Sequence, residues 1–108
     1  MRRIMGIATS VLLTLSAGSA MAEPLEFTLI NSTGYVITQL QISPLSMNHW
    51  GENILGTDVI LQGETATVTI ADGRTSCEYD MLITFNDGNT IEERNYDFCD
   101  LASYEATD

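Results

Sequence analysis

The stretch CEYDMLITFNDGNTIEERNYDFC, residues 77–99, decides the fold. From Cys77 to Phe85, every second residue is apolar, the period of a strand that buries one face. The Asn-Asp-Gly-Asn run at residues 86–89 favours a tight turn, because these residue types tolerate positive φ. Residues 90–98 then return antiparallel to the first strand, so the stretch predicts a long β-hairpin.

The length of the turn sets which residues face each other across this hairpin. A loop of residues 87–89 places Phe85 opposite Ile91 and the two cysteines opposite each other, with both pairs on the buried face. A two-residue turn instead turns Cys77 toward Phe98. A cysteine at each end of the hairpin favours the odd-length loop or a β-bulge.

Cys77 and Cys99 are the only cysteines of the chain. An even pair in an exported protein is typical of a disulfide, and loop entropy gives such a bridge roughly 3 kcal/mol. A zinc site on the same cysteines is disfavoured, because zinc takes four ligands and the chain has a single histidine. We therefore predict a disulfide that ties the two ends of the hairpin.

Four further segments have the alternation or the β-branched content of strands: residues 25–29, 35–42, 59–61 and 65–70. Clusters of Gly, Asn and Asp separate most of them, as turns do. Residues 101–108 are expected to form an acidic C-terminal tail, frayed or with one helical turn. The sequence thus predicts a single all-β domain over residues 23–100, a small antiparallel β-sandwich or barrel of about six strands with one disulfide.

The first 22 residues have the features of a Sec signal peptide. Arg2 and Arg3 give a basic start, a mostly apolar run follows, and Ala20-Met21-Ala22 is an A-x-A cleavage pattern. The apolar run is too short to span a bilayer. We expect cleavage after Ala22 and a periplasmic or secreted bacterial protein.

The chain after residue 22 is strongly acidic. It holds all fifteen Asp and Glu residues but only Arg74 and Arg94 as basic ones, a formal charge of −13. Nucleic acid and anionic membranes need cationic side chains, so this charge disfavours both as partners. It favours a basic protein or divalent cations, although a solvated acidic surface alone would have the same composition. Arg94 is expected to pair with Asp80 across the hairpin.

The loop SPLSMNHWGENILG, residues 43–56, holds the only histidine and the only tryptophan. Two interpretations of Trp50 are open. In one, the indole plugs one end of the sandwich, and Gly51 lets the backbone pass closely. In the other, Trp50 is an exposed anchor for a partner within a small apolar patch. The candidate binding residues of that patch are Leu45, Met47, His49 and Trp50.

Catalytic and metal sites have weaker support. A hydrolase would use His49 with Ser43 or Ser46 and a carboxylate, but the chain has no Gly-x-Ser-x-Gly elbow. Calcium takes hard oxygen ligands, and the segment after Phe85 offers several near one turn, although their spacing does not match an EF-hand. The candidate ligands are Asp87, Asn89 and Glu92. We predict no catalytic residue and no cofactor.

The pattern as a whole resembles a family of small secreted bacterial β-domain proteins without assigned function, over about residues 27–99. Some members carry an argininosuccinate lyase label. We reject it here, because that enzyme is a large, mostly helical tetramer with active sites shared between subunits. The resemblance implies export and a β-rich domain, and it brings no catalytic residues. It rests on Asn31, Thr33, Ser43, Pro44, Trp50, Gly51, Leu55, Gly63, Cys77, Tyr79, Asp80, Asp87, Gly88 and Cys99.

These observations predict an exported, acidic, non-enzymatic interaction domain that engages a basic protein. A calcium- or cation-binding module is the first alternative, and a small hydrolase using His49 is the second. The sequence leaves the oligomeric state open.

Overall fold

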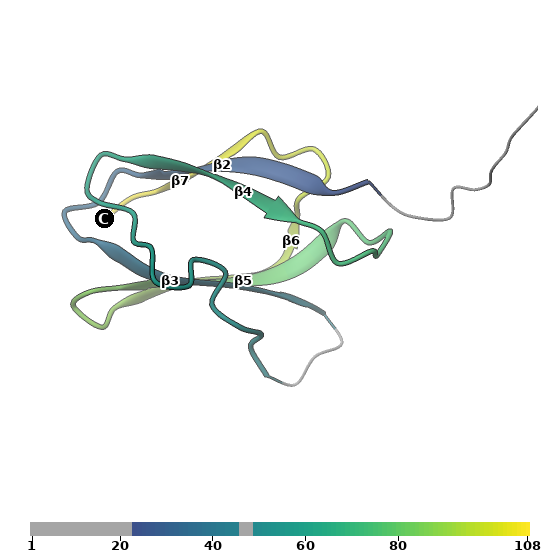
Figure 1. Cartoon of the computed structure of the whole chain (residues 1–108), viewed down its shortest axis with the longest axis horizontal. Coiled ribbons are helices and arrows are strands. Elements are labelled where there is room, and N and C mark those ends of the chain that lie inside the picture. The colour runs from purple at the N-terminus through teal and green to yellow at the C-terminus, as the bar shows by residue number, and fades with distance from the viewer. Residues whose placement is uncertain (1–22, 46–48) are drawn as a thin grey trace, which may run out of the picture.

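The computed structural model describes residues 23–45 and 49–108, and these form a two-layered β-sandwich (Figure 1). One three-stranded sheet has the order β4-β2-β7 and the other has the order β3-β5-β6. The all-β prediction is confirmed, and the two separate sheets make the domain a sandwich rather than a barrel. The strands are β2 (Leu25–Asn31), β3 (Ile37–Pro44), β4 (Thr65–Ile70), β5 (Glu78–Phe85), β6 (Thr90–Asp97) and β7 (Ser103–Ala106).

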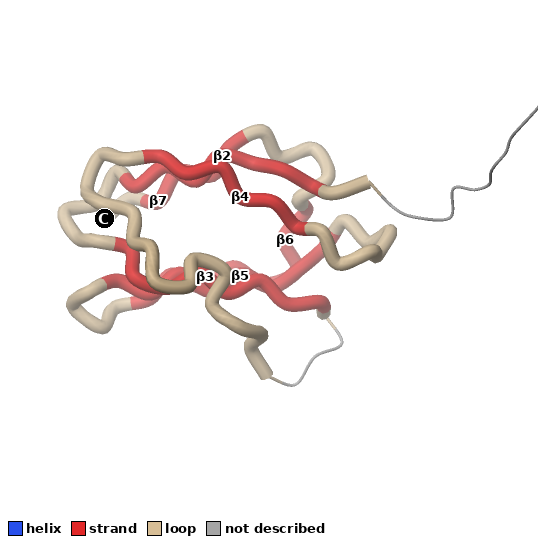
Figure 2. The backbone as a smooth tube through the Cα atoms, in the orientation of Figure 1, coloured by secondary structure: helices blue, strands red, loops and turns tan. Residues whose placement is uncertain are grey.

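Strands β5 and β6 form the predicted hairpin (Figure 2), but its register differs from the expected one. Ile91 lies opposite Ile83 rather than opposite Phe85. Phe85 instead closes the turn by donating its N–H to the carbonyl of Asn89 at 2.9 Å. The register differs because Gly88, with a φ of 89°, is the last residue of a three-residue loop and not its middle residue. The loop therefore spans residues 86–88.

A β-bulge then shifts the register near the open end of the hairpin. Tyr79 pairs with Tyr96, whereas Met81 pairs with Glu93, so β6 has one extra residue at this point. Asn95 lies within the bulge and has a left-handed φ of 57°. The bulge that the cysteine pattern suggested is thus present.

The predicted disulfide is confirmed, and Cys77 and Cys99 have Cα atoms 5.0 Å apart. The two residues are not directly opposite, because the carbonyl of Cys77 accepts the N–H of Phe98 at 2.8 Å. The expectation that the bridge lies on the buried face is wrong: Cys77 is half-buried and Cys99 is exposed. The disulfide therefore staples the rim of the hairpin rather than filling the core.

The core lies between the two sheets, and Phe98 is central to it. Its ring contacts those of Phe27, Tyr79 and Tyr96 at centroid distances of 5.3, 6.0 and 5.4 Å. Phe27 belongs to the sheet β4-β2-β7, the upper layer in Figure 1, so these aromatic contacts join the two layers. The other buried apolar residues are Leu29, Ile37, Leu40, Ile60, Val68, Ile70, Met81, Ile83, Phe85 and Ala106.

The sixth strand differs from the predicted one. Residues 59–61 form only a single bridge, between Ile60 and Ile37, and not a strand. The expected acidic tail instead contains β7, which pairs parallel with β2. The prediction of a frayed or helical tail is wrong here because Tyr104 and Ala106 alternate with polar residues, and Ala106 is fully buried. The other three strand pairs are antiparallel, as expected.

Tyr104 also closes the sandwich between β6 and β7. Its ring packs edge-on against Tyr96, and its hydroxyl donates to the carboxylate of Glu93 at 2.6 Å. Burial, together with the bond to Glu93, raises the pKa of the Tyr104 phenol. No helix in the described part of the chain has the length and apolar character needed to cross a membrane. The expected signal peptide lies outside the described residues.

Candidate binding surface

The chain from residue 49 onward begins on the outer face of the sheet β3-β5-β6, the lower layer in Figure 1. The start of this teal segment lies on the side of that layer that faces away from the upper layer. The N–H of Gly51 donates to the hydroxyl of Ser43 at 2.8 Å, and the amide of Gln41 donates to the carbonyl of Gly51 at 2.9 Å. Ser43 is buried beneath this contact. A Cβ added at Gly51 would meet Ser43 at an ordinary 3.5 Å, so sterics do not require glycine here.

The same segment then covers the free edge of β3. Asn53 accepts the N–H of Leu40 through its side-chain oxygen at 2.9 Å, and the N–H of Ile54 donates to the carbonyl of Leu40 at 2.7 Å. Farther along, Ile37 and Ile60 exchange two backbone hydrogen bonds. We call residues 51–60 the edge-covering loop. It satisfies backbone groups of an edge strand that would otherwise face solvent.

Trp50 directly precedes this loop and lies within a cluster of charged residues. The guanidinium carbon of Arg94 lies 4.7 Å from the centroid of the indole, a cation–π geometry. Arg94 also pairs with Asp80 at 3.1 Å and with Glu92. The hydrogen bond that Arg94 donates to Glu92, followed by the one that it donates to Asp80, raises the pKa of Arg94. The predicted pair of Asp80 and Arg94 is thus present, and Trp50 joins it.

This geometry corrects the structural interpretation of Trp50. Asp80 lies between the core residues Tyr79 and Met81, so its side chain is on the outer face of the sheet. Trp50 packs on that face through Arg94 and does not plug an end of the sandwich. Asp80 is nevertheless only 7 % exposed, and it also accepts the N–H of Asn95 at 2.9 Å. The cluster therefore holds both the bulge and the start of the edge-covering loop.

Of the four predicted binding residues, the structure describes three, and these differ in exposure. Trp50 is half-buried, His49 is exposed, and Met47 lies outside the described residues. Leu45 is 44 % exposed and borders a shallow hollow of about 400 Å³ beside the disulfide, with Glu78 on its wall. Leu45 and His49 are thus available to a partner, whereas the indole is largely engaged by Arg94.

Among the described residues, no hydrogen bond joins the hydrolase candidates Ser43 and His49. The hydroxyl of Ser43 is buried and occupied by Gly51, and Ser46 lies outside the described residues. Among the residues that the structure describes, His49 forms no hydrogen bond or ion pair with a carboxylate.

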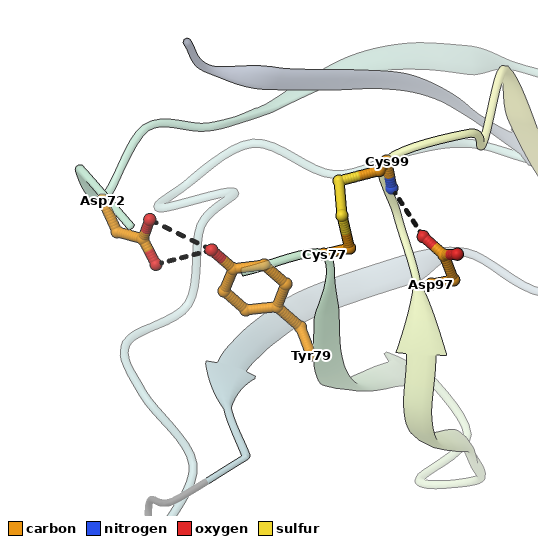
Figure 3. Close-up of a disulfide and its surroundings, with 5 residues drawn as sticks. All are labelled: Asp72, Cys77, Tyr79, Asp97 and Cys99. Atoms are coloured by element: carbon orange, nitrogen blue, oxygen red, sulfur yellow. Dashed lines mark hydrogen bonds between the residues drawn. A yellow bond between two sulfur atoms is a disulfide. The ribbon is translucent and has the colours of Figure 1, made fainter. Parts of the chain in front are cut away.

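Of the three calcium candidates, Asp87 and Asn89 bond to each other, whereas Glu92 has a different partner. Both carboxylate oxygens of Asp87 accept from Asn89, one from its backbone N–H at 3.0 Å and one from its side chain at 2.7 Å. Glu92 pairs with Arg94. Within the described residues, the one group with three close ligand atoms is Cys77, Asp97 and Cys99, whose sulfur atoms form the disulfide (Figure 3).

The polar residues behind the family resemblance mostly stabilise turns and loops. Asn31 is fully buried and bonds to three backbone carbonyls. The hydroxyl of Tyr79 donates to both carboxylate oxygens of Asp72 at 3.0–3.1 Å (Figure 3). Burial, together with this hydrogen bond, raises the pKa of Tyr79 to about 12. Ser43 likewise accepts the N–H of Gly51, and Asp80 accepts the N–H of Asn95 in the bulge, so these residues of the pattern hold loops and turns in place.

Comparison with protein-family models, with curated proteins and with solved structures finds no match. The family suggested by the sequence pattern therefore stays a prediction, and the functional argument rests on this chain alone.

The charge distribution is the most distinctive property of the surface. Arg74 and Arg94 are the only basic side chains among the described residues, apart from the single histidine, and both are already paired with carboxylates. Asp72, Asp80 and Glu92 are the carboxylates in these pairs. Twelve of the fifteen carboxylates of the chain thus have no cationic side chain of the described residues beside them.

Proposed function

We propose that this protein is an exported, acidic, non-enzymatic binding domain whose partner is a basic protein. The observation that carries the proposal is the internal use of both arginines. With no free cation in the described part of the chain, twelve carboxylates can be neutralised only by solvent ions or by a partner. A basic protein would be attracted over long distances, and its lysines and arginines would replace bound counterions.

Two further observations support a binding role. Two of the polar side chains that could serve acid–base or nucleophilic chemistry are already engaged, because Ser43 holds Gly51 and Asp80 holds the bulge and Arg94. The disulfide gives a small domain rigidity in an oxidising compartment, which is the environment that the predicted export provides. A rigid scaffold loses little conformational entropy on binding, so weak electrostatic contacts can add up to useful affinity.

The test is the salt dependence of binding by the mature, oxidised protein. The protein is immobilised, exposed to the cation-exchange fraction of exported proteins, and the retained partner is purified for calorimetry. We expect the dissociation constant to rise at least tenfold between 50 and 300 mM NaCl, because salt screens exposed charges. A partner with an acidic isoelectric point, or an affinity unchanged by salt, would overturn the proposal. Millimolar calcium is expected to leave the melting temperature unchanged, whereas the calcium alternative requires a rise.

A further inference from the structure

The two sheets have four edges, and three of them are protected against pairing with another strand. Strand β3 is covered by the edge-covering loop. Strand β6 carries three successive charged residues at 92–94 and is interrupted by the bulge at Asn95. Strand β7 has only four residues. Charges, bulges, covers and short length are the devices by which proteins block edge-to-edge association.

Strand β4 has none of these devices. Its sequence, TATVTI, is uncharged, free of proline and rich in β-branched residues. It pairs with β2 over six residues without a bulge, and the described residues place no strand on its other side. An uncovered edge of this kind is a template for an additional strand.

The hydrogen bonds of β2 show which groups of β4 point outward. Thr28 donates its N–H away from β4, toward Ala102, whereas Asn31 donates toward Glu64, which precedes β4. Backbone groups alternate along a strand, so the odd-numbered residues of β2 bond to β4. Their partners are Ala66, Val68 and Ile70. It follows that Thr65, Thr67 and Thr69 direct their N–H and C=O groups away from β2.

A groove runs beside this edge. It encloses about 360 Å³ between residues 66–69 of β4 and the edge-covering loop. Ile54 and Val59 border it and are 42 % and 47 % exposed. Alternate side chains of an added strand would reach this apolar surface, because side chains of a strand point to opposite faces. The edge therefore offers backbone bonds for affinity and a groove for side-chain selection.

The charges at this edge decide between a basic partner and a second copy of the chain. Asp58 lines the groove and Glu64 directly precedes β4, and neither forms an ion pair among the described residues. Two copies joined through β4 would bring these carboxylates close to each other, although each chain after residue 22 already carries a formal charge of −13. Like charges would therefore oppose this dimer. An extended segment with lysine or arginine beside apolar residues would instead neutralise them.

We propose that β4 is the docking site of the basic partner, which adds an extended segment to the upper sheet and places alternate apolar side chains in the groove. This inference rests on the proposed function and adds the surface and the mode of binding. The free edge supplies up to three donors and three acceptors, and the flanking carboxylates select a cationic segment.

The first experiment follows backbone amides while a defined probe binds. The probe is a synthetic peptide of alternating valine and threonine with two lysines at each end, and its glutamate-flanked counterpart is the charge control. Hydrogen exchange is measured by NMR on the mature, oxidised protein. We expect the amides of Thr65, Thr67 and Thr69 to exchange at least tenfold more slowly with the lysine-flanked peptide, and no change with the control. Binding of either peptide without this protection would overturn the docking site.

The second experiment uses variants that act on the groove and on the edge. Val59→Glu places a charge in the groove and makes the protein more acidic, so a loss of affinity for a basic partner cannot come from net charge. Leu45→Glu makes the same change at an equally exposed position elsewhere. Thr67→Pro removes an outward donor that takes no part in the pairing with β2, and Thr67→Val retains that donor. We expect at least a tenfold weaker affinity for Val59→Glu and Thr67→Pro, and less than a twofold change for the other two.

The outcomes separate this inference from the proposed function. If the basic partner binds in a salt-dependent manner but Val59→Glu and Thr67→Pro bind as the wild type does, the docking site is wrong and the proposed function stands. If affinity is lost only in Leu45→Glu, the partner docks beside the disulfide. A wild-type dimer in sedimentation equilibrium that Thr67→Pro dissociates would show that the occupant is a second copy. Failure of every basic protein and peptide to bind would refute both proposals.

Discussion

Replacing Asn31 with alanine should destabilise this domain strongly, because the substitution removes a fully buried polar side chain. The side chain is fully buried where β2 ends and the chain turns toward the other sheet. Its amide donates to the carbonyls of Tyr35, Ile60 and Leu61 at 2.8, 3.0 and 3.2 Å. Its oxygen accepts the N–H and the hydroxyl of Thr33 at 3.1 and 2.7 Å. One residue thereby ties a turn and the end of the edge-covering loop to β2.

The magnitude follows from the bonds that would be lost and the groups that would be left without partners. Two amide protons and two accepted bonds make about four buried hydrogen bonds, each worth about 1 kcal/mol net. The carbonyl of Ile60 keeps the N–H of Ile37, and that of Leu61 keeps the N–H of Glu64. The N–H of Thr33 keeps no partner among the described residues, at a further cost of about 1–3 kcal/mol. We expect a loss of roughly 5–7 kcal/mol.

Such a loss is comparable with the whole stability of a domain of this size, for which roughly 4–13 kcal/mol is typical. The measurement is urea unfolding of the mature, oxidised protein, followed by far-UV circular dichroism. Asn53→Ala is the matched control, because Asn53 bonds to Leu40, Leu55 and Gly56 but is only half-buried, so that water can replace it. We expect the control to lose about 1–2 kcal/mol. Equal losses for the two variants, or less than about 1.5 kcal/mol for Asn31→Ala, would refute this reasoning.

Three further predictions follow from the contacts. Replacing Cys77 and Cys99 with serine should lower the free energy of unfolding by about 3 kcal/mol, the loop entropy of a bridge with a separation of 22 residues, and an unchanged urea midpoint would contradict it. Tyr79 should contribute about 2–3 kcal/mol to the fall in stability between pH 10 and 12, because burial and Asp72 favour its protonated form in the folded state; Tyr104 adds to this fall, so Tyr79→Phe should make the fall shallower without removing it, and equal slopes would count against the prediction. Arg94→Gln should shift Trp50 emission to the red and raise acrylamide quenching about twofold as the stacked cation is lost, whereas Arg74→Gln should change neither.

The sequence predicts the strands well where the alternation is long. The hairpin of residues 77–99, its disulfide and the inward face of β5 all follow from period two and from the cysteine spacing. The register is harder to predict, because moving the left-handed glycine by one position within the turn changes every opposing pair. Strand β7 is not predicted, because its four residues lie among exposed carboxylates and resemble an acidic tail in the sequence. Only the structure shows that Ala106 pairs with Asn31.

The site is less predictable for a related reason. The tryptophan and the histidine are the conspicuous residues of the chain, yet Trp50 is held by Arg94, and the cluster stabilises the sheet.

The surface that the structure leaves open is formed by threonines that no chemical motif would select. Alternation in a sequence indicates which face of a strand is buried, but not whether its backbone has a neighbour on each side. That property depends on sheet order, a long-range feature set by the crossover of residues 98–102 and by the loop over β3. The edges of β3, β6 and β7 are protected by a covering loop, by charges with a bulge, and by short length, whereas the edge of β4 has no such protection. Folding alone does not explain why this one edge is left uncovered.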